Sequence, residues 1–581
     1  MKKLTKITAL LCAIFSFANL ATACGGDKEK ERDTTKTYLT VYNYDGGVGT
    51  QWLHDTAKRF EELYAEKELE EGKKGIVVDV VAGKDNMATL AASPNNVFFT
   101  EQMAFNDLIA KNQLLDISDM AESSFTNLGL SETGNVLDKI PTETKDALLA
   151  QNGKLYALPH YEVYTGVSYD RDLFEAKGLF IQQRAQGETT TKFCKSNATN
   201  ISVGPDGKKG SYDDGLPSSY EEFYDLVNQM LKLQVTPFIY TGQHATYINH
   251  IVTGAWATYT GVDEFRLNVT LDSTVDTEEG EDPITTEIIT GWNANGTPIV
   301  EETTITMETG YKTLAQAGRY YALEFLRTLM SSGPSAGKSW AGDGLVFSDL
   351  VPTSSHLDAQ MHYVFSNLDP YYEKPIGMII EGSYWYNEAK SALAASEKQF
   401  GEDAKDRDFS YMPLPVQVSG QVTEGNGKKN TLLDANVSFA FINANIANDP
   451  VISQLAKDFL QFCYSDQELV NFTKETSIFK GVAYNVDKSL FEGSSKFAQH
   501  MFEIRQNSDV IRPYAANKIY VNAQATFNYA GTGGSWSSTV NGTPYAFPRE
   551  AFRGGVSSKD YFLGMQKTEA EWIASYGKYF D

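Results

Sequence analysis

An acid followed by two adjacent aromatic residues closes an apolar run in the second half of the chain. Residues 376–380 are mostly apolar, Glu381 follows them, and a Gly-Ser pair leads to Tyr384 and Trp385. Carboxylates accept hydrogen bonds from hydroxyl groups, and flat rings stack on apolar faces such as those of sugars. We therefore expect Glu381, Tyr384 and Trp385 to bind a hydroxyl-rich ligand, with packing between structural units as the alternative role of the rings.

Further polar and aromatic candidates follow other apolar runs, lie just after Pro159, or, for Trp256 and Trp536, lie on a predicted helix and in a Gly/Asn/Ser-rich part of the tail. They share the ability to stack on a ring face or to hydrogen-bond a hydroxyl group. These residues are Asn43, Tyr44, Glu101, Tyr161, Glu162, Gln243, Trp256 and Trp536.

A glycine-rich segment over residues 204–215 carries Asp206, Asp213 and Asp214. Calcium takes six to eight oxygen ligands, including carboxylates and backbone carbonyls. The spacing lacks the alternating acids of an EF-hand loop, so a glycine-rich turn explains the segment equally well. A structural calcium ion is one expectation here, and we expect no other cofactor.

Signatures of common enzymes are missing from the sequence. Residues 332–339 resemble a phosphate-binding loop but have the wrong glycine spacing, and neither H-E-x-x-H nor G-x-S-x-G occurs. We therefore expect a protein that is not an enzyme. A glycosidase needs only two carboxylates at a set separation, and with 75 acidic residues it stays an alternative.

The composition describes a large, acidic, globular protein. The 581 residues include 50 Lys and Arg against 75 Asp and Glu, a formal net charge of −25. This charge argues against binding to nucleic acid, whose phosphates require clustered basic residues. Four cysteines are too few for a disulfide scaffold, and the length predicts two to four domains.

The first 23 residues have the pattern of a secretory signal peptide. Three lysines precede an apolar run over residues 7–20, which is too short for a membrane span and ends in Ala-Thr-Ala before Cys24. This exit resembles a bacterial lipobox, which implies that Cys24 carries a lipid. Residues 24–37 then read as a flexible tether. We expect the mature chain on the outer face of the cytoplasmic membrane, with plain secretion as the alternative.

Strands and helices alternate after the tether. Strands are predicted at residues 38–44, 76–81 and 97–99, and helices at residues 50–64 and from 105 onward. This alternation predicts an α/β fold with a largely parallel sheet covered on both faces. Ligands of such sheets bind beyond the carboxyl ends of the strands, where Asn43, Tyr44 and Glu101 are expected.

Several motifs in order resemble family 1 extracellular solute-binding proteins, the sugar-capturing lipoproteins of ABC importers. The resemblance covers roughly residues 38–485 and is weaker in the last hundred. The motifs are Val97-Phe98-Phe99-Thr100-Glu101, Phe105-Asn106-Asp107-Leu108-Ile109-Ala110-Lys111, Gly153-Lys154-Leu155-Tyr156-Ala157-Leu158-Pro159, Val167-Ser168-Tyr169-Asp170 and Ile379-Ile380-Glu381-Gly382-Ser383-Tyr384-Trp385.

The resemblance implies a hinged, two-lobed periplasmic-binding-protein-like fold of type II. Residues 38–162 and 412–485 would form the N-terminal lobe, and residues 163–411 and 486–581 the C-terminal lobe. The return crossing is expected at the proline-bracketed run 412–415, and one helix is expected over residues 454–472. Residues 263–309 hold twelve acidic residues and one arginine and predict an acidic β-hairpin insertion with an Asn295-Gly296 turn.

The same resemblance implies function and partners. The protein is expected to capture a carbohydrate, most readily an oligosaccharide, by closing two lobes around it and to deliver it to the permease subunits of an ABC importer. We expect a monomer that meets the membrane only through its lipid. In the family, the first aromatic residue after Gly-Ser commonly stacks on the sugar, and that position is Tyr384. A cell-surface glycan-binding protein without a transporter is the main alternative, and a peptide or another polar solute is a further candidate cargo.

Overall fold

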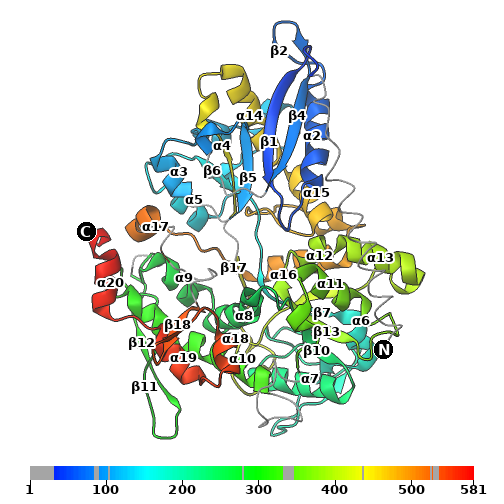
Figure 1. Ribbon diagram of the computed structural model, residues 1–581, viewed down its shortest axis with the longest axis vertical. Helices are drawn as coiled ribbons and strands as arrows, with labels where there is room; N and C mark the ends of the chain where they lie inside the picture. The colour runs from blue at the N-terminus through cyan, green and yellow to red at the C-terminus, as the bar shows by residue number, and fades with distance from the viewer. Residues whose placement is uncertain are drawn as a thin grey trace.

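Two α/β lobes, each built around its own sheet, lie one above the other in the computed structural model (Figure 1). The structure describes residues 32–83, 90–101, 105–275, 277, 280–331, 346–434, 438–523, 527 and 536–580. The predicted signal peptide, Cys24, most of the tether and the loop 332–339 lie outside the described residues. The two-lobed fold expected from the resemblance is confirmed.

The first-lobe sheet is mixed and has the strand order β4-β1-β5-β16-β6. β1 pairs in parallel with β4 and β5, whereas β16 runs antiparallel to β5 and β6. The largely parallel sheet that we predicted is therefore confined to three strands, because β16 is formed by chain that returns from the other lobe. The strands are β1 (Thr37–Tyr44), β4 (Ile76–Gly83), β5 (Val97–Glu101), β6 (Ala157–Pro159) and β16 (Ser438–Ile442), with a small hairpin of β2 (Glu68–Glu70) and β3 (Lys73–Lys74) beside them.

Apolar helix faces cover this sheet. α2 buries Trp52, Leu53 and Phe60, which recur at the helical spacing seen in the sequence. The helix predicted over residues 454–472 is two helices, because the backbone is extended at Ser465, the N-cap residue of α15, with a ψ of 152°. At this break the carbonyl of Tyr464 accepts a bond from Lys139 Nζ at 2.9 Å. The helices are α2 (Gln51–Tyr64), α3 (Phe105–Ala110), α4 (Ser118–Glu122), α5 (Thr142–Leu149), α14 (Pro450–Phe462) and α15 (Asp466–Thr476).

The second-lobe sheet has the order β10-β13-β7-β14 and is also mixed, with β10 parallel to β13 and the other pairs antiparallel. β13 is buried along its whole length, which agrees with its continuous apolar run. Its strands are β7 (Thr165–Asp170), β10 (Thr236–Ile239), β13 (Ile376–Gly382) and β14 (Phe409–Met412), with smaller pairs of β8 (Phe180–Ile181) with β9 (Phe193–Cys194) and β15 (Thr431–Leu433) with β17 (Asp509–Ile511). Its helices before the C-terminal region are α6 (Arg171–Lys177), α7 (Tyr220–Lys232), α8 (Asn249–Thr260), α9 (Val262–Thr270), α10 (Ala317–Ser331), α11 (His356–Phe365), α12 (Trp385–Glu388) and α13 (Lys390–Phe400).

Three chain segments run together where the lobes join. The first crossing lies between β6 and β7, and in it Glu162 pairs with Phe479 and Tyr164 pairs with Asp434. Backbone pairing among three passes gives the junction defined geometry, and each pass is short enough to act as a hinge.

The return crossing comes later than the predicted run 412–415. Residues after β14 stay on the second lobe, where the carbonyl of Gln417 accepts a bond from the backbone N–H of Tyr220 at the start of α7. Asp434 still follows β15 of this lobe, and the first-lobe strand β16 begins at Ser438. The boundary at residue 412 was therefore wrong: the prolines lie at the end of a second-lobe strand rather than at the crossing.

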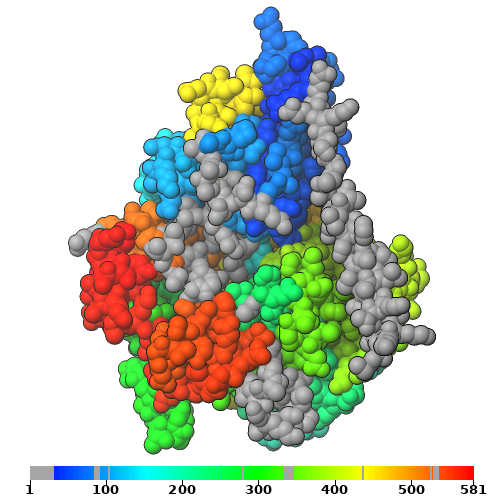
Figure 2. Space-filling model, in the orientation of Figure 1, coloured from blue at the N-terminus to red at the C-terminus, as the bar shows by residue number. Residues whose placement is uncertain are grey.

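The C-terminal region packs mostly on the second lobe (Figures 1 and 2). α19 contacts α10 and β18, whereas α17 contacts α3 of the first lobe. The elements are α16 (Lys496–Asn507), α17 (Lys518–Ala523), β18 (Ser538–Val540), β19 (Thr543–Tyr545), α18 (Pro548–Arg553), α19 (Ser558–Met565) and α20 (Glu569–Tyr576). Within the described ranges, no helix combines the length and apolar character needed to cross a bilayer.

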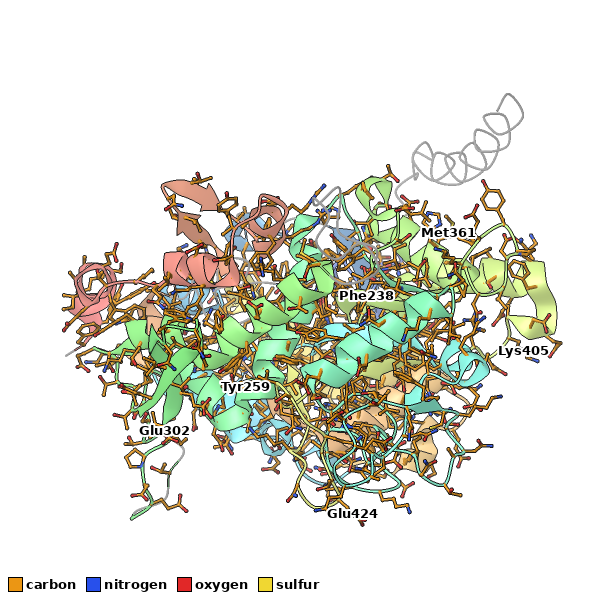
Figure 3. The ribbon with its side chains drawn as sticks, turned by 90° about the horizontal axis from the view of Figure 1, so that it is seen from below. Phe238, Tyr259, Glu302, Met361, Lys405 and Glu424 are labelled. Atoms are coloured by element: carbon orange, nitrogen blue, oxygen red, sulfur yellow. The ribbon has the colours of Figure 1, made fainter. Side chains whose placement is uncertain are left out.

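The acidic segment contains the predicted hairpin. β11 (Thr286–Trp292) pairs antiparallel with β12 (Pro298–Thr303), and Gly296 in the turn has a φ of 85°, which favours glycine. Glu302 lies on this arm at the edge of the molecule (Figure 3). Tyr259 of α8 donates a hydrogen bond to Glu287 Oε2 at 3.2 Å and so joins the hairpin base to the lobe.

Candidate functional site

A cluster of buried polar groups lies at the carboxyl end of β13. Glu381 ends the apolar part of the strand and is 2% exposed. Gln360 of α11 donates from Nε2 to Glu381 Oε1 at 3.1 Å and to Glu388 Oε2 at 2.8 Å. One amide therefore holds two carboxyl groups together, one from a strand and one from the short helix α12.

Two tyrosines and a histidine lie beside the carboxyl groups. Tyr384 caps the start of α12 and shares a hydrogen bond with Tyr247. The Tyr384 ring centroid is 6.3 Å from that of His250, whose Nδ1 is 2.8 Å from Thr165 Oγ1. Tyr384 and Tyr247 each keep part of their surface exposed.

Burial sets the protonation of this cluster. It raises the pKa of Glu381 well above its usual value, and the neighbouring Glu388 raises it further. Burial also raises the pKa of Glu388 to about 7, with a contribution from Glu101 of the first lobe. Burial lowers the pKa of His250 to about 4, so this histidine is neutral at pH 7.

The first lobe contributes a matching group of residues at the ends of β1 and β5. Tyr161 donates a hydrogen bond from its hydroxyl to Glu101 Oε1. Burial and the charge of Glu101 raise the pKa of Tyr44, which shows that the two side chains lie near each other. Tyr44 and Glu101 thus lie at the sheet edge that the topology indicated, and Tyr161 of the first crossing joins them there.

The two groups face each other where the lobes touch. Asn387 of α12 donates from Nδ2 to the carbonyl of Gly47 at 2.5 Å. A Cβ atom at Gly47 would lie 3.2 Å from Tyr384 Cβ and 3.3 Å from Glu388 Oε1, so the loop after β1 packs closely on the site. Lys390 donates a second bond between the lobes, to the carbonyl of Glu475.

Three predicted tryptophan contacts are instead core residues. Trp385 is 0% exposed, donates from Nε1 to Ser168 Oγ at 2.9 Å and packs against Tyr363. Trp256 and Trp536 are also 0% exposed and pack edge to face with ring centroids 5.6 Å apart. Their prediction as ligand contacts was wrong, because the large rings fill the second-lobe interior.

Glu162 has a structural role rather than the predicted ligand contact. It is 1% exposed, and its carboxylate accepts bonds from Arg505 Nε at 3.0 Å, from Arg512 Nε at 2.7 Å and from the Tyr164 hydroxyl. Both carboxylate oxygens are therefore occupied at the hinge.

Asn43 and Gln243 lie close to the site, but their side-chain amides donate hydrogen bonds to backbone carbonyls. Asn43 is 1% exposed and donates from Nδ2 to the carbonyls of Tyr44 and Gly49, which shapes the loop that reaches the second lobe. Gln243 is exposed and donates from Nε2 to the carbonyl of Thr353 at 3.1 Å.

The aspartates expected to bind calcium stabilise a turn-rich loop. Asp206 accepts from the backbone of Lys208, Asp213 accepts from the backbone of Asp206, and Asp214 accepts from the backbone of Gly210. Across the described part of the chain, no group of three or more His, Cys, Asp or Glu side chains is arranged to hold a metal ion. These bonds explain the three aspartates without a metal.

Four members of the site were not predicted: Tyr247, His250, Gln360 and Glu388. Glu388 follows Tyr384 by four residues, a spacing that places two side chains on one face of a helical turn and could have identified it. Tyr247 and Gln360 come from segments that only the fold brings near β13, and nothing in their local sequence indicates a site.

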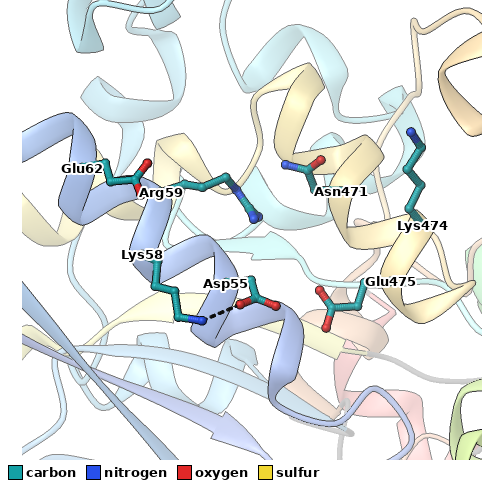
Figure 4. Close-up of a pocket in the computed structure, with 7 residues that line it drawn as sticks. All are labelled: Asp55, Lys58, Arg59, Glu62, Asn471, Lys474 and Glu475. Atoms are coloured by element: carbon teal, nitrogen blue, oxygen red, sulfur yellow. Dashed lines mark hydrogen bonds and ion pairs between the residues drawn. The ribbon is translucent and has the colours of Figure 1, made fainter.

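A separate charged hollow of about 430 Å³ lies between α2 and α15 of the first lobe (Figure 4). Its lining includes no aromatic residue, and Lys58 there pairs with Asp55 at 2.9 Å. The seven lining residues are Asp55, Lys58, Arg59, Glu62, Asn471, Lys474 and Glu475. The hollow is distinct from the cluster at β13 and does not contain the rings expected at a sugar site.

No protein-family model and no curated protein matches the chain. Similar solved structures include a chitin oligosaccharide binding protein (13% identity, TM-score 0.49, 93% of this chain and 99% of that chain). Maltose-bound MalE3 of T. maritima has the same identity and TM-score over 93% of this chain and 100% of its own. The ABC substrate-binding protein Lmo0181 of Listeria monocytogenes, in complex with cycloalternan, has 11% identity and a TM-score of 0.48 over 93% of this chain and 99% of its own. These are the kind of protein that the sequence motifs resemble, although the identities and scores are too low to transfer a ligand to this chain.

Proposed function

We propose that the protein binds a carbohydrate between its two lobes and does not transform it. The observation that carries this proposal is the meeting of Tyr44, Glu101 and Tyr161 with Tyr384 and Glu388 across the lobe contact. Rings supply stacking surfaces, and carboxyl groups supply acceptors for hydroxyl groups. A ligand that touches both groups stabilises the closed arrangement over the open one.

The finer part of the proposal concerns delivery. The motif order and the lipobox-like exit at Cys24 support a lipid-anchored binding protein on the outer face of the cytoplasmic membrane. There it would hand an oligosaccharide to the permease subunits of an ABC importer, which would recognise the closed form.

Titration calorimetry of the mature chain, residues 24–581, against a panel of oligosaccharides tests the proposal. We expect one class of sugar to bind with micromolar or tighter affinity, about 8 kcal/mol or more. Product analysis by chromatography after long incubation is expected to show the sugar intact. Shortened products would instead indicate a glycosidase, and no binding across the panel would contradict carbohydrate capture.

A Tyr384→Ala variant locates the sugar once it is known. We expect its affinity to fall about tenfold, which corresponds to about 1.4 kcal/mol, because the ring is lost from the contact. Tyr371→Ala is the matched control, since Tyr371 is a 77% exposed second-lobe tyrosine away from the cluster. Equal affinity in both variants would place the sugar elsewhere.

A further inference from the structure

The cluster at β13 presents hydrogen-bond acceptors that have no donor. Glu381 Oε2 and Gln360 Oε1 are both buried and unpartnered, in residues that are 2% and 1% exposed. Gln360 uses its Nε2 group on the two carboxyl groups, so its own donors are already engaged. A buried acceptor without a donor is unfavourable, and a ligand that supplies donors removes this cost.

Three carboxyl groups, those of Glu381, Glu388 and Glu101, gather around these acceptors. In the described part of the chain, neither Glu381 nor Glu388 forms an ion pair with a lysine, arginine or histidine. Glu101 faces Glu388 from the first lobe, and both raise the pKa of groups near them. His250, Tyr247 and Tyr384 complete the surroundings, and all three are neutral at pH 7 because burial disfavours their charged forms.

A protonated amine fits this arrangement better than a hydroxyl group does. An ammonium group has three donors and no acceptor, whereas a hydroxyl group has one donor and also needs donors from the protein. The oxygens of Glu381, Glu388 and Gln360 are three acceptors held on one strand and two helices. The neighbouring tyrosine rings add faces on which a cation is favourable.

We propose that the ligand carries a protonated amine that binds among Glu381, Glu388 and Gln360, so that the preferred cargo is an amino sugar. This inference rests on the proposed function, because it places the amine in the same contact between the lobes. The bound cation favours the ionised form of the acidic pair, and the closing loop at Gly47 then covers it.

Calorimetry with three probes tests the inference on the mature chain. The probes are glucosamine oligosaccharides with free amines, their N-acetylated counterparts of equal length, and spermidine, at a pH below the pKa of the amines. We expect the free-amine sugars to bind at least about tenfold more tightly than the acetylated ones. Each Glu388→Gln and Glu381→Gln variant is expected to remove most of this preference.

Glu402→Gln is the control, because the Glu402 side chain is 91% exposed on the same lobe. It is expected to keep the wild-type preference. Thermal unfolding of each variant checks folding, and Glu381→Gln and Glu388→Gln replace each carboxyl group with an uncharged amide of equal size.

Each outcome decides the inference. Equal or tighter binding of the acetylated or another uncharged sugar overturns the amine assignment and leaves carbohydrate capture standing. Binding of spermidine alone, lost in Glu388→Gln, would place an amine at the cluster but overturns the amino-sugar assignment and contradicts carbohydrate capture. An amine preference that survives both substitutions places the amine elsewhere and overturns the inference. Failure of all three probes to bind overturns it as well, and carbohydrate capture then depends on the wider oligosaccharide panel.

Discussion

Tyr384 and Trp385 are adjacent in the chain and lie in different surroundings. Tyr384 reaches the contact between the lobes, where Gly47 packs against it, whereas Trp385 is enclosed by rings such as Phe409 and bonded to Ser168. The backbone of Tyr384 is helical, with a φ of −71° and a ψ of −17°, so successive side chains point in directions about 100° apart. One residue therefore belongs to the site and the next to the core.

Replacement of Trp385 is expected to affect folding. Trp385→Ala removes a fully buried ring and leaves a cavity, which should lower the free energy of unfolding by about 3–5 kcal/mol. Urea unfolding monitored by circular dichroism measures this. Tyr371→Ala, at an exposed ring, is expected to change it by about 0.5 kcal/mol or less. A small loss for Trp385→Ala would mean that the ring is not a core residue.

Glu162 makes the free energy of unfolding depend on pH in the acidic range. Burial alone would raise its pKa, but the charges of Arg505 and Arg512 lower it below 4.5. Because the pKa of Glu162 is lower in the folded than in the unfolded protein, its ion pairs stabilise the fold at pH values above the unfolded-state pKa. This stabilisation is lost as the pH falls through the folded-state pKa. Glu162→Gln removes the carboxylate shared by two buried arginines, of which Arg512 keeps its ion pair with Glu143, so we expect a loss of about 3 kcal/mol near neutral pH.

The acid dependence of Glu162→Gln provides the check. Urea unfolding at a series of pH values from neutral to below the folded-state pKa should show the wild type losing more stability than the variant, so that the two curves converge in acid. Parallel curves would contradict the assignment of Glu162 as the ionised partner of the arginines.

The hairpin β11–β12 is an element joined to the second lobe at its base. Its tip, residues 293–297, carries none of the site residues and lies away from β13 (Figure 1). Replacing this tip with Asn-Gly, the residues of a tight hairpin turn, should leave sugar affinity unchanged within about twofold. Calorimetry measures the affinity, and a clear loss would make the hairpin part of the binding surface.

Individual elements show how far sequence reasoning reaches. The apolar runs at residues 38–44, 76–81 and 97–99 predicted β1, β4 and β5. A short apolar run flanked by turn residues is typical of a buried strand. The break between α14 and α15 escaped a prediction from apolar periodicity, although Ser465 followed by Asp466 and Glu468 is a local sign of a helix start. The bond from Lys139 to Tyr464 at this break joins residues more than 300 apart, and local periodicity does not record such contacts.

The same limit applies to the site. Tyr44 and Glu101 could be predicted together because the ends of adjacent parallel strands meet at one sheet edge. The partners of Glu162 lie 343 and 350 residues away, so its buried ion pairs were invisible in the sequence. Gln360 and Tyr247 escaped prediction for the same physical reason.

At the scale of the whole molecule, the fit at Gly47 couples the lobes. A methyl group there would lie 3.2 to 3.3 Å from Tyr384 and Glu388, so these neighbours would have to shift by a few tenths of an ångström. Gly47→Ala is therefore expected to weaken sugar binding by about 1–3 kcal/mol through overpacking of the closed form. Each lobe is expected to stay folded, as judged by circular dichroism. Unchanged affinity would mean that this contact is absent in the bound state.

The central claim is that one sugar contacts both lobes at once. The most direct test compares the calorimetric affinity of the identified sugar for the wild type, for Tyr44→Ala in the first lobe and for Tyr384→Ala in the second. The account predicts that each substitution weakens binding about tenfold or more while the variants stay folded. Wild-type affinity in either folded variant would contradict a site shared between the two lobes.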